Sequence, residues 1–403
     1  MISYELLKMA GVSFGSGVSA KTGERIRSMG GRNALIVTDK GIVSLGIVDK
    51  VARSLEEAGL TYEVFDEVMP EPTDELCIRL ADIAKDKNFD TVIGLGGGSP
   101  IDTAKAAGLI AGIREMEEIT DLHDYSANGG KSAVAAAAKR KGLLITMPTT
   151  SGTGAETTQS SVLTSVKYGM KYSFMGPASM ADLCIIDPEF TVGMPAVPTI
   201  HTGLDALAHA VENLIGITNN DYSELMMLEC IRRIWKWLPV AVSDPKNRTA
   251  REQMAWAAHN AQANGGVPNG HAVAHALGSK YHLVHAHACM LTLPTAIRHF
   301  AETSQDAIAK LADVIGAPTC GDAQADAEYV AQKIKAFYKS FGYKNLQETL
   351  KEKGVEVDRE TFAQSLVEFT LDDFKSHLWN PPIHTDNAKE KVAGVCRRIY
   401  DEE

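Results

Sequence analysis

The sequence predicts an α/β N-terminal domain with a parallel sheet, followed by an all-helical C-terminal domain. Up to about residue 187, short apolar and β-branched runs alternate with amphipathic stretches, which is the pattern of a parallel sheet covered by helices. After Pro188 the strand signals stop and long helical patterns take over. Because proline disfavours helix in the preceding residue and breaks a strand ladder, we place the boundary there, with domains at 1–187 and 188–403.

Each expected element has its own sequence signal. The strand-like runs are ALIVT at 34–38, YEVF at 62–65, TVIGL at 91–95, LLITM at 143–147 and LCIID at 183–187. Between them, residues 46–58 and 75–86 place apolar side chains three and four apart, as one buried helix face requires. The helical patterns of the second domain cover 202–215, 221–238, 250–263, 303–315, 323–340 and 359–375.

Composition narrows the classes of partner. The chain has 40 Lys and Arg against 51 Asp and Glu, a net charge of −11 that would repel nucleic acid and anionic membranes, so a small molecule is the expected partner. Its 6 cysteines form neither a CxxC clip nor a disulfide framework. No secretory leader and no stretch of ~18 apolar residues is found. These features predict a cytoplasmic protein.

A glycine-rich turn joins the strand at 91–95 to a helix. Gly96, Gly97 and Gly98 would let the backbone approach a ligand, while the helix N-terminus attracts phosphate. We expect Ser99 to cap this helix, with Asp102 as the acid of a capping box. A cofactor pyrophosphate would fit here. The alternative is a tight, well-capped turn without a ligand, since the segment is neither GxGxxG nor a P-loop.

A second polar loop follows the strand at 143–147. The segment PTTSGTGAET at 148–157 offers the hydroxyls of Thr149, Thr150, Ser151 and Thr153. Ligands of open α/β sheets bind beyond the carboxyl ends of the strands, where both loops would lie. Taken alone, the loop would be better explained as an ordinary Ser/Thr-rich turn. Together, the two loops are better evidence for a phosphate-bearing ligand than either loop alone.

Histidines crowd one part of the second half of the chain. Of the 12 histidines, those between residues 201 and 287 are His201, His209, His259, His271, His275, His282, His285 and His287. Asp205 and His209 are four apart, as are His271 and His275, so helices would place each pair on one face. One carboxylate and three imidazoles make a metal-ligand set, and the absence of a thiolate favours a catalytic divalent ion.

One histidine of this cluster is not needed as a metal ligand, and part of the cluster has an explanation without a metal. The remaining histidine would orient a ligand or relay a proton. Taken as a pair, Asp205 and His209 are better explained as hydrogen-bonded core residues, with Asp205 completing a capping box with Thr202.

The sequence resembles the iron-containing, or group III, alcohol dehydrogenases over nearly its whole length. The matching motifs are VTDKG at 37–41, GGGSPIDTAK at 96–105, PTTSGTGAE at 148–156, IIDPE at 185–189, TGLDALAHAVE at 202–212 and HAVAHALG with its later histidine at 271–285. The resemblance implies a dehydroquinate synthase-like architecture with an N-terminal dinucleotide-binding domain, which binds NAD(P) and one Fe²⁺ or Zn²⁺, usually as a dimer or larger homo-oligomer.

The resemblance also assigns residues. The metal ligands carry over to Asp205, His209, His271 and His285, and His275 takes the position that assists proton transfer. Gly97, Gly98 and Ser99 would hold the pyrophosphate, and Thr149, Thr150, Thr153 and Lys171 would line the rest of the cofactor site. Asp39 ends the first strand, where an acid binds ribose hydroxyls and repels a 2′-phosphate, so NAD(H) is expected rather than NADP(H).

Three departures from the family pattern bear on the substrate. The family's AFxNAxLG becomes AQANGGVP at 261–268, PHGxAN becomes VHAHAC at 284–289, and TNPR becomes WNPP at 379–382. Gln262 and His287 make the expected pocket more polar, which favours short hydroxylated or anionic aldehydes such as sulfo- or carboxy-aldehydes. The role of Cys289 stays open.

Other functions remain as alternatives. The nearest is a glycerol or 1,3-propanediol type of dehydrogenase. A lyase of the dehydroquinate synthase type would need several basic residues near its phosphate-bearing substrate, and this chain offers only Lys280 beside the ligand loop. A nucleotide-binding scaffold with structural histidines ranks last, because it would leave the four ligands unexplained.

Overall fold

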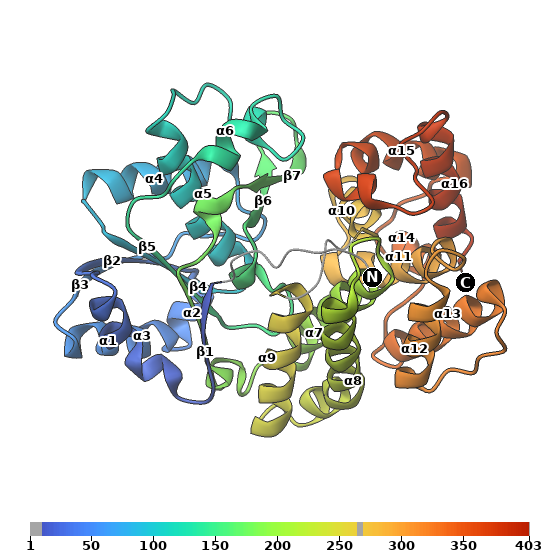
Figure 1. Cartoon of the computed structure of the whole chain (residues 1–403), viewed down its shortest axis with the longest axis horizontal. Helices are drawn as coiled ribbons and strands as arrows, with labels where there is room; N and C mark the ends of the chain where they lie inside the picture. The colour runs from blue at the N-terminus through green and yellow to red at the C-terminus, as the bar shows by residue number, and fades with distance from the viewer. Residues whose placement is uncertain (1–9, 264–268, 403) are drawn as a thin grey trace. The chain divides into compact units, whose positions relative to one another are not determined.

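The computed structural model describes residues 10–263 and 269–402, which form two compact units (Figure 1). The sheet unit consists of the described residues up to Met194 together with Pro245–His259. The helical unit consists of Pro195–Asp244 and the described residues from Asn260 onwards. These units differ from the division expected at residue 187 in two segments, because residues 188–194 and 245–259 make their contacts with the sheet unit.

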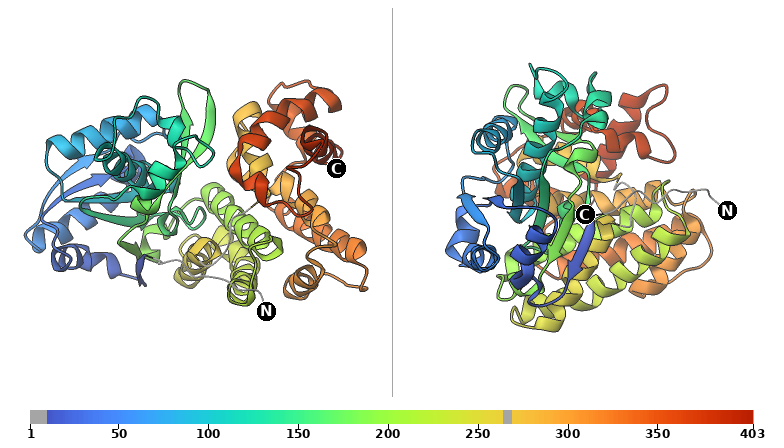
Figure 2. Two further views of the ribbon diagram at one scale, coloured as in Figure 1. Left: turned by 45° about the horizontal axis from the view of Figure 1, so that its top comes forward. Right: turned by 60° about the vertical axis from the view of Figure 1, so that its left-hand side comes forward.

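The sheet unit is built on six parallel strands in the order β1-β8-β5-β4-β2-β3. The strands are β1 (Gly11–Phe14), β2 (Asn33–Val37), β3 (Thr61–Phe65), β4 (Thr91–Gly96), β5 (Leu143–Pro148) and β8 (Leu183–Ile186), with a separate antiparallel hairpin of β6 (Ser160–Ser165) and β7 (Met170–Met175). All five expected strands are confirmed. Neither β1 nor the hairpin, which packs against helix α5 and is green in Figure 2, was expected.

Helices cover both faces of this sheet, as the alternation along β2 shows. Ala34 and Ile36 point into one apolar core, and Leu35 and Val37 point into the other. In Figure 1, α1 and α3 cover one face, and α4 and α5 cover the opposite face. The helices of this unit are α1 (Thr22–Ser28), α2 (Lys40–Ser44), α3 (Ile47–Glu57), α4 (Asp74–Asp86), α5 (Gly98–Arg114) and α6 (Ser132–Ala137).

The helical unit contains the metal-ligand candidates. Its helices, with α9 shared between the units, are α7 (Ala196–Ile215), α8 (Asp221–Ser243), α9 (Arg248–Ala263), α10 (His271–Tyr281), α11 (His285–His299), α12 (Gln305–Ile315), α13 (Ala323–Lys339), α14 (Leu346–Glu352), α15 (Arg359–Asp372) and α16 (Ala388–Tyr400). Short 3₁₀ helices occur at Val18–Lys21, Leu122–Tyr125, Ala155–Thr157, Pro177–Ser179, Pro188–Thr191 and Phe374–Leu378.

The expected fold class is confirmed: among the described residues, no strand follows β8. Helix α7 packs against α8 and α11, and α10 packs against α11 and α15. None of the described helices has the length and apolar character required to cross a bilayer.

A buried lysine holds the loop after β5 against helix α5. Lys105 is fully buried, and its ammonium donates to the carbonyl oxygens of Ala155 and Ser160, 2.7 and 2.5 Å away, and to Thr158 Oγ1 at 2.9 Å. Burial lowers the pKa of this ammonium to about 8, even though Asp102 opposes the shift. Lys105 therefore fixes one end of the polar loop that follows β5.

We predict that Lys105→Met lowers the free energy of unfolding by about 3 kcal/mol, because the substitution leaves two carbonyl oxygens without their charged donor. Urea unfolding followed by circular dichroism measures this loss. Lys50→Met, at an exposed position of α3, is the matched control. Equal stability of the two variants would show that the buried ammonium does not support the loop.

Candidate metal and cofactor sites

Helix α7 presents three polar residues on one buried face. Asp205, His209 and Glu212 follow one another at four- and three-residue spacing, so they project from the same side of the helix. Asp205 and His209 are each 4% exposed, and Glu212 is fully buried. Thr202 lies within α7 and donates to the carbonyl oxygen of Pro198, so the alternative that Asp205 completes a capping box with Thr202 is wrong.

The carboxylate of Asp205 faces the predicted imidazoles. Its Oδ1 lies 3.7 Å from His209 Nε2, 3.5 Å from His271 Nε2 and 3.4 Å from His285 Nε2. This buried oxygen accepts no hydrogen bond of regular geometry among the described residues. Four donor atoms about 2.1 Å from one ion, in a tetrahedron, lie about 3.4 Å apart. The three distances from Asp205 Oδ1 therefore fit neighbouring donors around one metal position. Among the described residues, the group whose donor atoms all lie within 4.8 Å of one another is Asp205, His271, His285 and Cys289, and it does not include His209.

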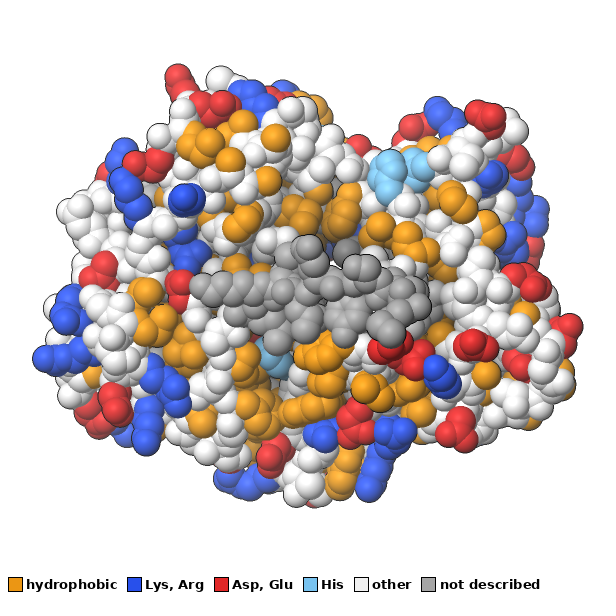
Figure 3. Space-filling model, viewed as in Figure 1, with side chains coloured by type: hydrophobic (Ala, Val, Ile, Leu, Met, Phe, Trp, Pro, Cys, Tyr) orange, Lys and Arg blue, Asp and Glu red, His pale blue; other side chains and the backbone are white. Residues whose placement is uncertain are grey.

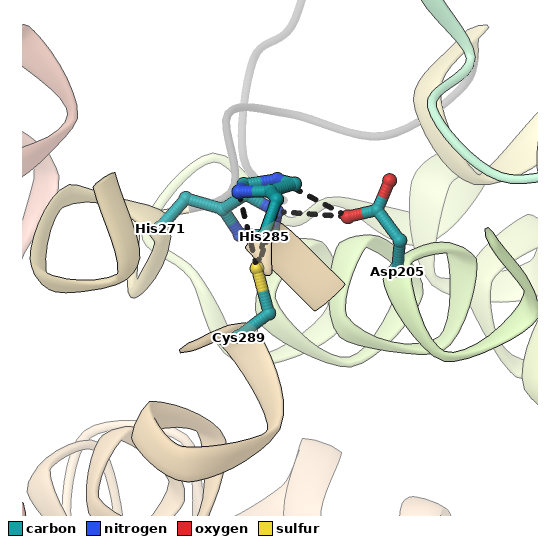
Figure 4. A group of neighbouring side chains, drawn as sticks. All are labelled: Asp205, His271, His285 and Cys289. Carbon is teal, nitrogen blue, oxygen red and sulfur yellow. Dashed lines mark hydrogen bonds and ion pairs between the residues drawn. The ribbon is translucent and has the colours of Figure 1, made fainter. Parts of the chain in front are cut away.

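The charges within the cluster also favour a cation. Burial alone would raise the pKa of Asp205, but His209, His285 and His271 hold it well below its usual value. The carboxylate is thus ionised inside the helical unit, where an unpaired charge is costly. Figure 4 shows Asp205, His271 and His285 directed toward one another, with Cys289 beside the two imidazoles.

Glu212 orients one of these imidazoles. Its Oε2 accepts hydrogen bonds from both the backbone N–H and the Nδ1–H of His271, each at 3.0 Å. The bond at Nδ1 leaves Nε2 as the atom directed at Asp205. Gly270 makes this contact possible, because a Cβ at that position would lie 2.9 to 3.0 Å from the Glu212 carboxylate.

His275 belongs to a second polar group beside the first. Its Nδ1 donates to Asp373 Oδ2 at 2.6 Å, and Lys375 Nζ lies 3.7 Å from Asp373 Oδ1. Burial and the Lys375 charge lower the pKa of His275 to about 3, although Asp373 opposes the shift. Burial and Lys375 therefore keep the imidazole neutral, and the hydrogen bond to Asp373 fixes its proton on Nδ1, which leaves Nε2 unprotonated. The His275 ring centroid is 5.3 Å from that of His285.

The glycine turn of the sheet unit lies directly against the second polar loop. A Cβ at Gly97 would come 3.6 Å from Thr150 Cγ2, and one at Gly98 would come 3.1 Å from Thr153 Cγ2. Gly96 adopts φ +154°, and a Cβ there would lie only 2.6 Å from Pro100, so this position requires glycine. The turn and loop are brought together as expected.

The expected capping of helix α5 is wrong. The helix begins at Gly98 with Gly97 as its N-cap, so Ser99 lies inside the first turn and provides no cap. Asp102 instead accepts from the backbone N–H of Val162 at 3.1 Å and so ties α5 to the hairpin. The backbone N–H groups at the start of α5 are consequently not capped by a side chain.

Unpaired hydroxyls lie where a cofactor would bind. Thr38 follows β2, and Thr149 and Ser151 follow β5, at the carboxyl ends of parallel strands. Their hydroxyls are buried and have no hydrogen-bond partner within the described residues. Buried polar atoms are normally paired, so these hydroxyls, together with the uncapped helix start, fit a site for a phosphate-bearing cofactor.

Two other expected cofactor residues already have partners. Asp39 is the N-cap of α2, where Oδ1 accepts from the backbone N–H of Ile42 at 3.0 Å. Lys171 lies on β7 and forms an ion pair with Glu71 at 2.7 Å. Their roles toward a cofactor stay predictions.

The structure also shows where His287 and Gln262 lie, the two residues on which the expected polar substrate pocket depends. His287 does not join the histidine cluster: its ring contacts Tyr343 at 4.7 Å, and its Nε2 donates to the carbonyl oxygen of Lys344. Gln262 is half-buried in the last turn of α9, and residues 264–268 of the same departure lie outside the described residues. Sequence reasoning gave no role to Glu212, Asp373 and Lys375, which the structure places around the histidines.

Comparison with known proteins defines the class. Two family models match the chain: iron-containing alcohol dehydrogenase over residues 10–188, and the C-terminal part of the Fe-containing alcohol dehydrogenase family over residues 199–377. The chain therefore belongs to the iron-containing alcohol dehydrogenase family, as its motifs predicted. This is a family of oxidoreductases that bind NAD(H) and a divalent metal.

Individual relatives agree with this assignment. The chain is 31% identical to an NAD-dependent methanol dehydrogenase of Bacillus methanolicus, covering 81% of this chain and 84% of the relative. It is 33% identical to a 1,3-propanediol dehydrogenase of Citrobacter freundii, with 79% and 81% covered. The structure of an alcohol dehydrogenase from Oenococcus oeni matches with a TM-score of 0.86 at 27% identity, covering 99% of this chain and all of that one.

We predict that Glu212→Gln lowers metal affinity about 10- to 100-fold, because the loss of the carboxylate weakens the hold on the Nδ1–H of His271. Competition with a metal chelator measures the affinity, and circular dichroism checks the fold. Glu224→Gln, which changes the half-buried partner of Lys310 on α8, away from the histidines, serves as control. Unchanged affinity in both variants would rule out this orienting role.

Proposed function

We propose that the chain is a metal-dependent, NAD(H)-linked alcohol dehydrogenase that acts as an aldehyde reductase on short, polar or anionic aldehydes. The observation that carries the metal-dependent part is the Asp205 carboxylate, whose Oδ1 has three imidazole Nε2 atoms within 3.7 Å. Asp205, His209, His271 and His285 would hold Fe²⁺ or Zn²⁺, since carboxylate and imidazole accept both. Family membership supports the same assignment.

Different residues of the chain would hold the protons of the histidines, transfer the substrate proton and bind the cofactor. Glu212 holds the proton on His271 Nδ1, and Asp373 holds the one on His275 Nδ1. His275 Nε2 would relay the proton between the substrate oxygen and solvent, because a group with a pKa of about 3 passes a proton on rather than keeping it near neutral pH. Gly97, Gly98 and Ser99 would bind the pyrophosphate, with Thr149, Thr150, Thr153 and Lys171 along the rest of the cofactor. When bound, the metal supplies Lewis acidity at the substrate oxygen, and the nicotinamide exchanges hydride.

The polar substrate is supported by the surroundings of His275. Lys375 is a buried cation whose contact with Asp373, at 3.7 Å, is too long for a hydrogen bond. A carboxylate or sulfonate on the aldehyde would provide a second partner for this ammonium. The alternative substrate is glycerol or 1,3-propanediol, since relatives at 33% identity are 1,3-propanediol dehydrogenases.

The last part of the proposal concerns the partner, the cellular location and the oligomeric state of the enzyme. Figure 3 shows acidic and basic side chains interspersed over the visible face, and the net charge is −11. This surface suits a small-molecule partner better than nucleic acid or an anionic membrane. A cytoplasmic location and a homo-oligomeric state complete the proposal.

The decisive experiment combines metal analysis with an aldehyde panel. Anaerobically purified protein should carry about one Fe or Zn per chain and oxidise NADH with one polar aldehyde far faster than with butanal. The panel contains glyceraldehyde, 3-hydroxypropanal, succinic semialdehyde and sulfoacetaldehyde. His271→Ala should lose metal and turnover together. If butanal exceeds every polar aldehyde, the polar pocket is wrong; if His271→Ala keeps both properties, the ligand assignment is wrong.

Cofactor choice has a test of its own. Asp39→Asn keeps an oxygen that can cap α2 but removes the charge that would repel a 2′-phosphate. We predict that the ratio of turnover with NADPH to turnover with NADH rises about tenfold, equivalent to about 1.4 kcal/mol. Asp49→Asn, at an exposed site in α3, should leave the ratio unchanged. If Asp39→Asn also leaves it unchanged, Asp39 does not select the cofactor.

A further inference from the structure

A buried thiol lies inside the cluster of metal-ligand candidates. Cys289 is fully buried on α11, one helical turn after His285. Its Sγ lies 3.4 Å from His271 Nε2 and 3.7 Å from His285 Nε2. The same two nitrogen atoms lie 3.5 and 3.4 Å from Asp205 Oδ1. The thiol and the carboxylate therefore share two imidazole neighbours.

These distances form a consistent coordination set. Around one zinc ion, with metal–sulfur about 2.3 Å and metal–nitrogen about 2.0 to 2.1 Å, tetrahedral geometry separates sulfur from nitrogen by about 3.6 Å. The observed sulfur–nitrogen distances of 3.4 and 3.7 Å lie on either side of this value. One donor atom from each of Asp205, His271, His285 and Cys289 lies within 4.8 Å of all the others (Figure 4).

We propose that Cys289 coordinates the metal as a thiolate, so that this chain has a mixed carboxylate, imidazole and thiolate centre. The proposal rests on the metal site of the proposed function. The four donors whose mutual distances fit a tetrahedron are then Asp205, His271, His285 and Cys289, with His209 Nε2, 3.7 Å from Asp205 Oδ1, as an additional fifth donor. Cys289 stands at the position where the family pattern PHGxAN has asparagine. On coordination the Sγ–H bond breaks, the sulfur binds the ion, and the proton leaves to water.

A sulfur ligand changes which ion the site prefers. Thiolates are soft ligands that favour zinc over the harder divalent ions, whereas carboxylate and imidazole discriminate less. Cys289 thereby biases this centre toward Zn²⁺. A protein with the same aspartate and histidines and an asparagine at this position would lack that bias.

The test uses cobalt as a spectroscopic probe. Co²⁺ is added anaerobically to the metal-free full-length protein, and a sulfur-to-cobalt charge-transfer band is sought in the near ultraviolet. The wild type should show the band, and Cys289→Ser and Cys289→Asn should lack it while still binding Co²⁺. Cys230→Ala removes a buried thiol on α8 and should keep it. In competition with Fe²⁺, both Cys289 variants should lose at least about tenfold in preference for Zn²⁺.

The outcomes separate this proposal from the proposed function. If the wild type binds Co²⁺ without the band, or if Cys289→Ser retains it, the thiolate ligand is wrong and the remaining metal site stands. If the wild type binds no Co²⁺, Zn²⁺ or Fe²⁺, the metal site itself is wrong, and the thiolate with it. Loss of the band in both Cys289 variants, with the fold intact by circular dichroism, supports the proposal.

Discussion

The helical unit depends on one electrostatic constraint, the ionised carboxylate of Asp205 inside helix α7. At 4% exposure this group has lost most of its water, and within residues 10–263 and 269–402 its Oδ1 has no regular hydrogen bond to replace it. A buried charge is tolerated only when other charges or a metal compensate it. The imidazoles of His209, His271 and His285 lie within 3.7 Å of the oxygen and supply this compensation, and α11, which carries His285, packs against both α7 and α10, which carry the other two.

The residues behind the imidazoles make the arrangement precise. A histidine without a partner at Nδ1 is free to rotate and to exchange tautomers, which would move its Nε2 away from the centre. Glu212 removes this freedom for His271, and Asp373 does so for His275. Their carboxylates come from distant parts of the chain, one on α7 and one just after α15. The site is therefore held by tertiary packing as much as by the helices that contain its ligands.

Local patterns in the sequence were sufficient for much of this. Apolar β-branched runs predict the sheet strands, and the crowding of histidines together with the family motifs points to Asp205, His209 and His271, although the spacing of Asp205 and His209 alone favours core residues. Helical spacing also places two further residues on the same helix faces, Glu212, which had no expected role, and Cys289, whose role the sequence leaves open. Glu212 is seven residues after Asp205, and Cys289 is four after His285. Asp373 had no local signal, because its partner His275 is 98 residues away and only the packing of α10 against α15 brings them together. The cap of α5 was misplaced because Gly97 and Ser99 both suit such a position.

The origin of the ligands has a consequence for folding. Asp205 and His209 lie on α7, His271 on α10, and His285 and Cys289 on α11, so a single bound ion would cross-link three helices that are separate in sequence. An ion that binds only the folded chain raises the free energy of unfolding of that chain. The increase is about 4.1 kcal/mol when the concentration of free ion is 1,000 times the dissociation constant. Metal supply in the cell would thus set how long the protein survives as well as how fast it works.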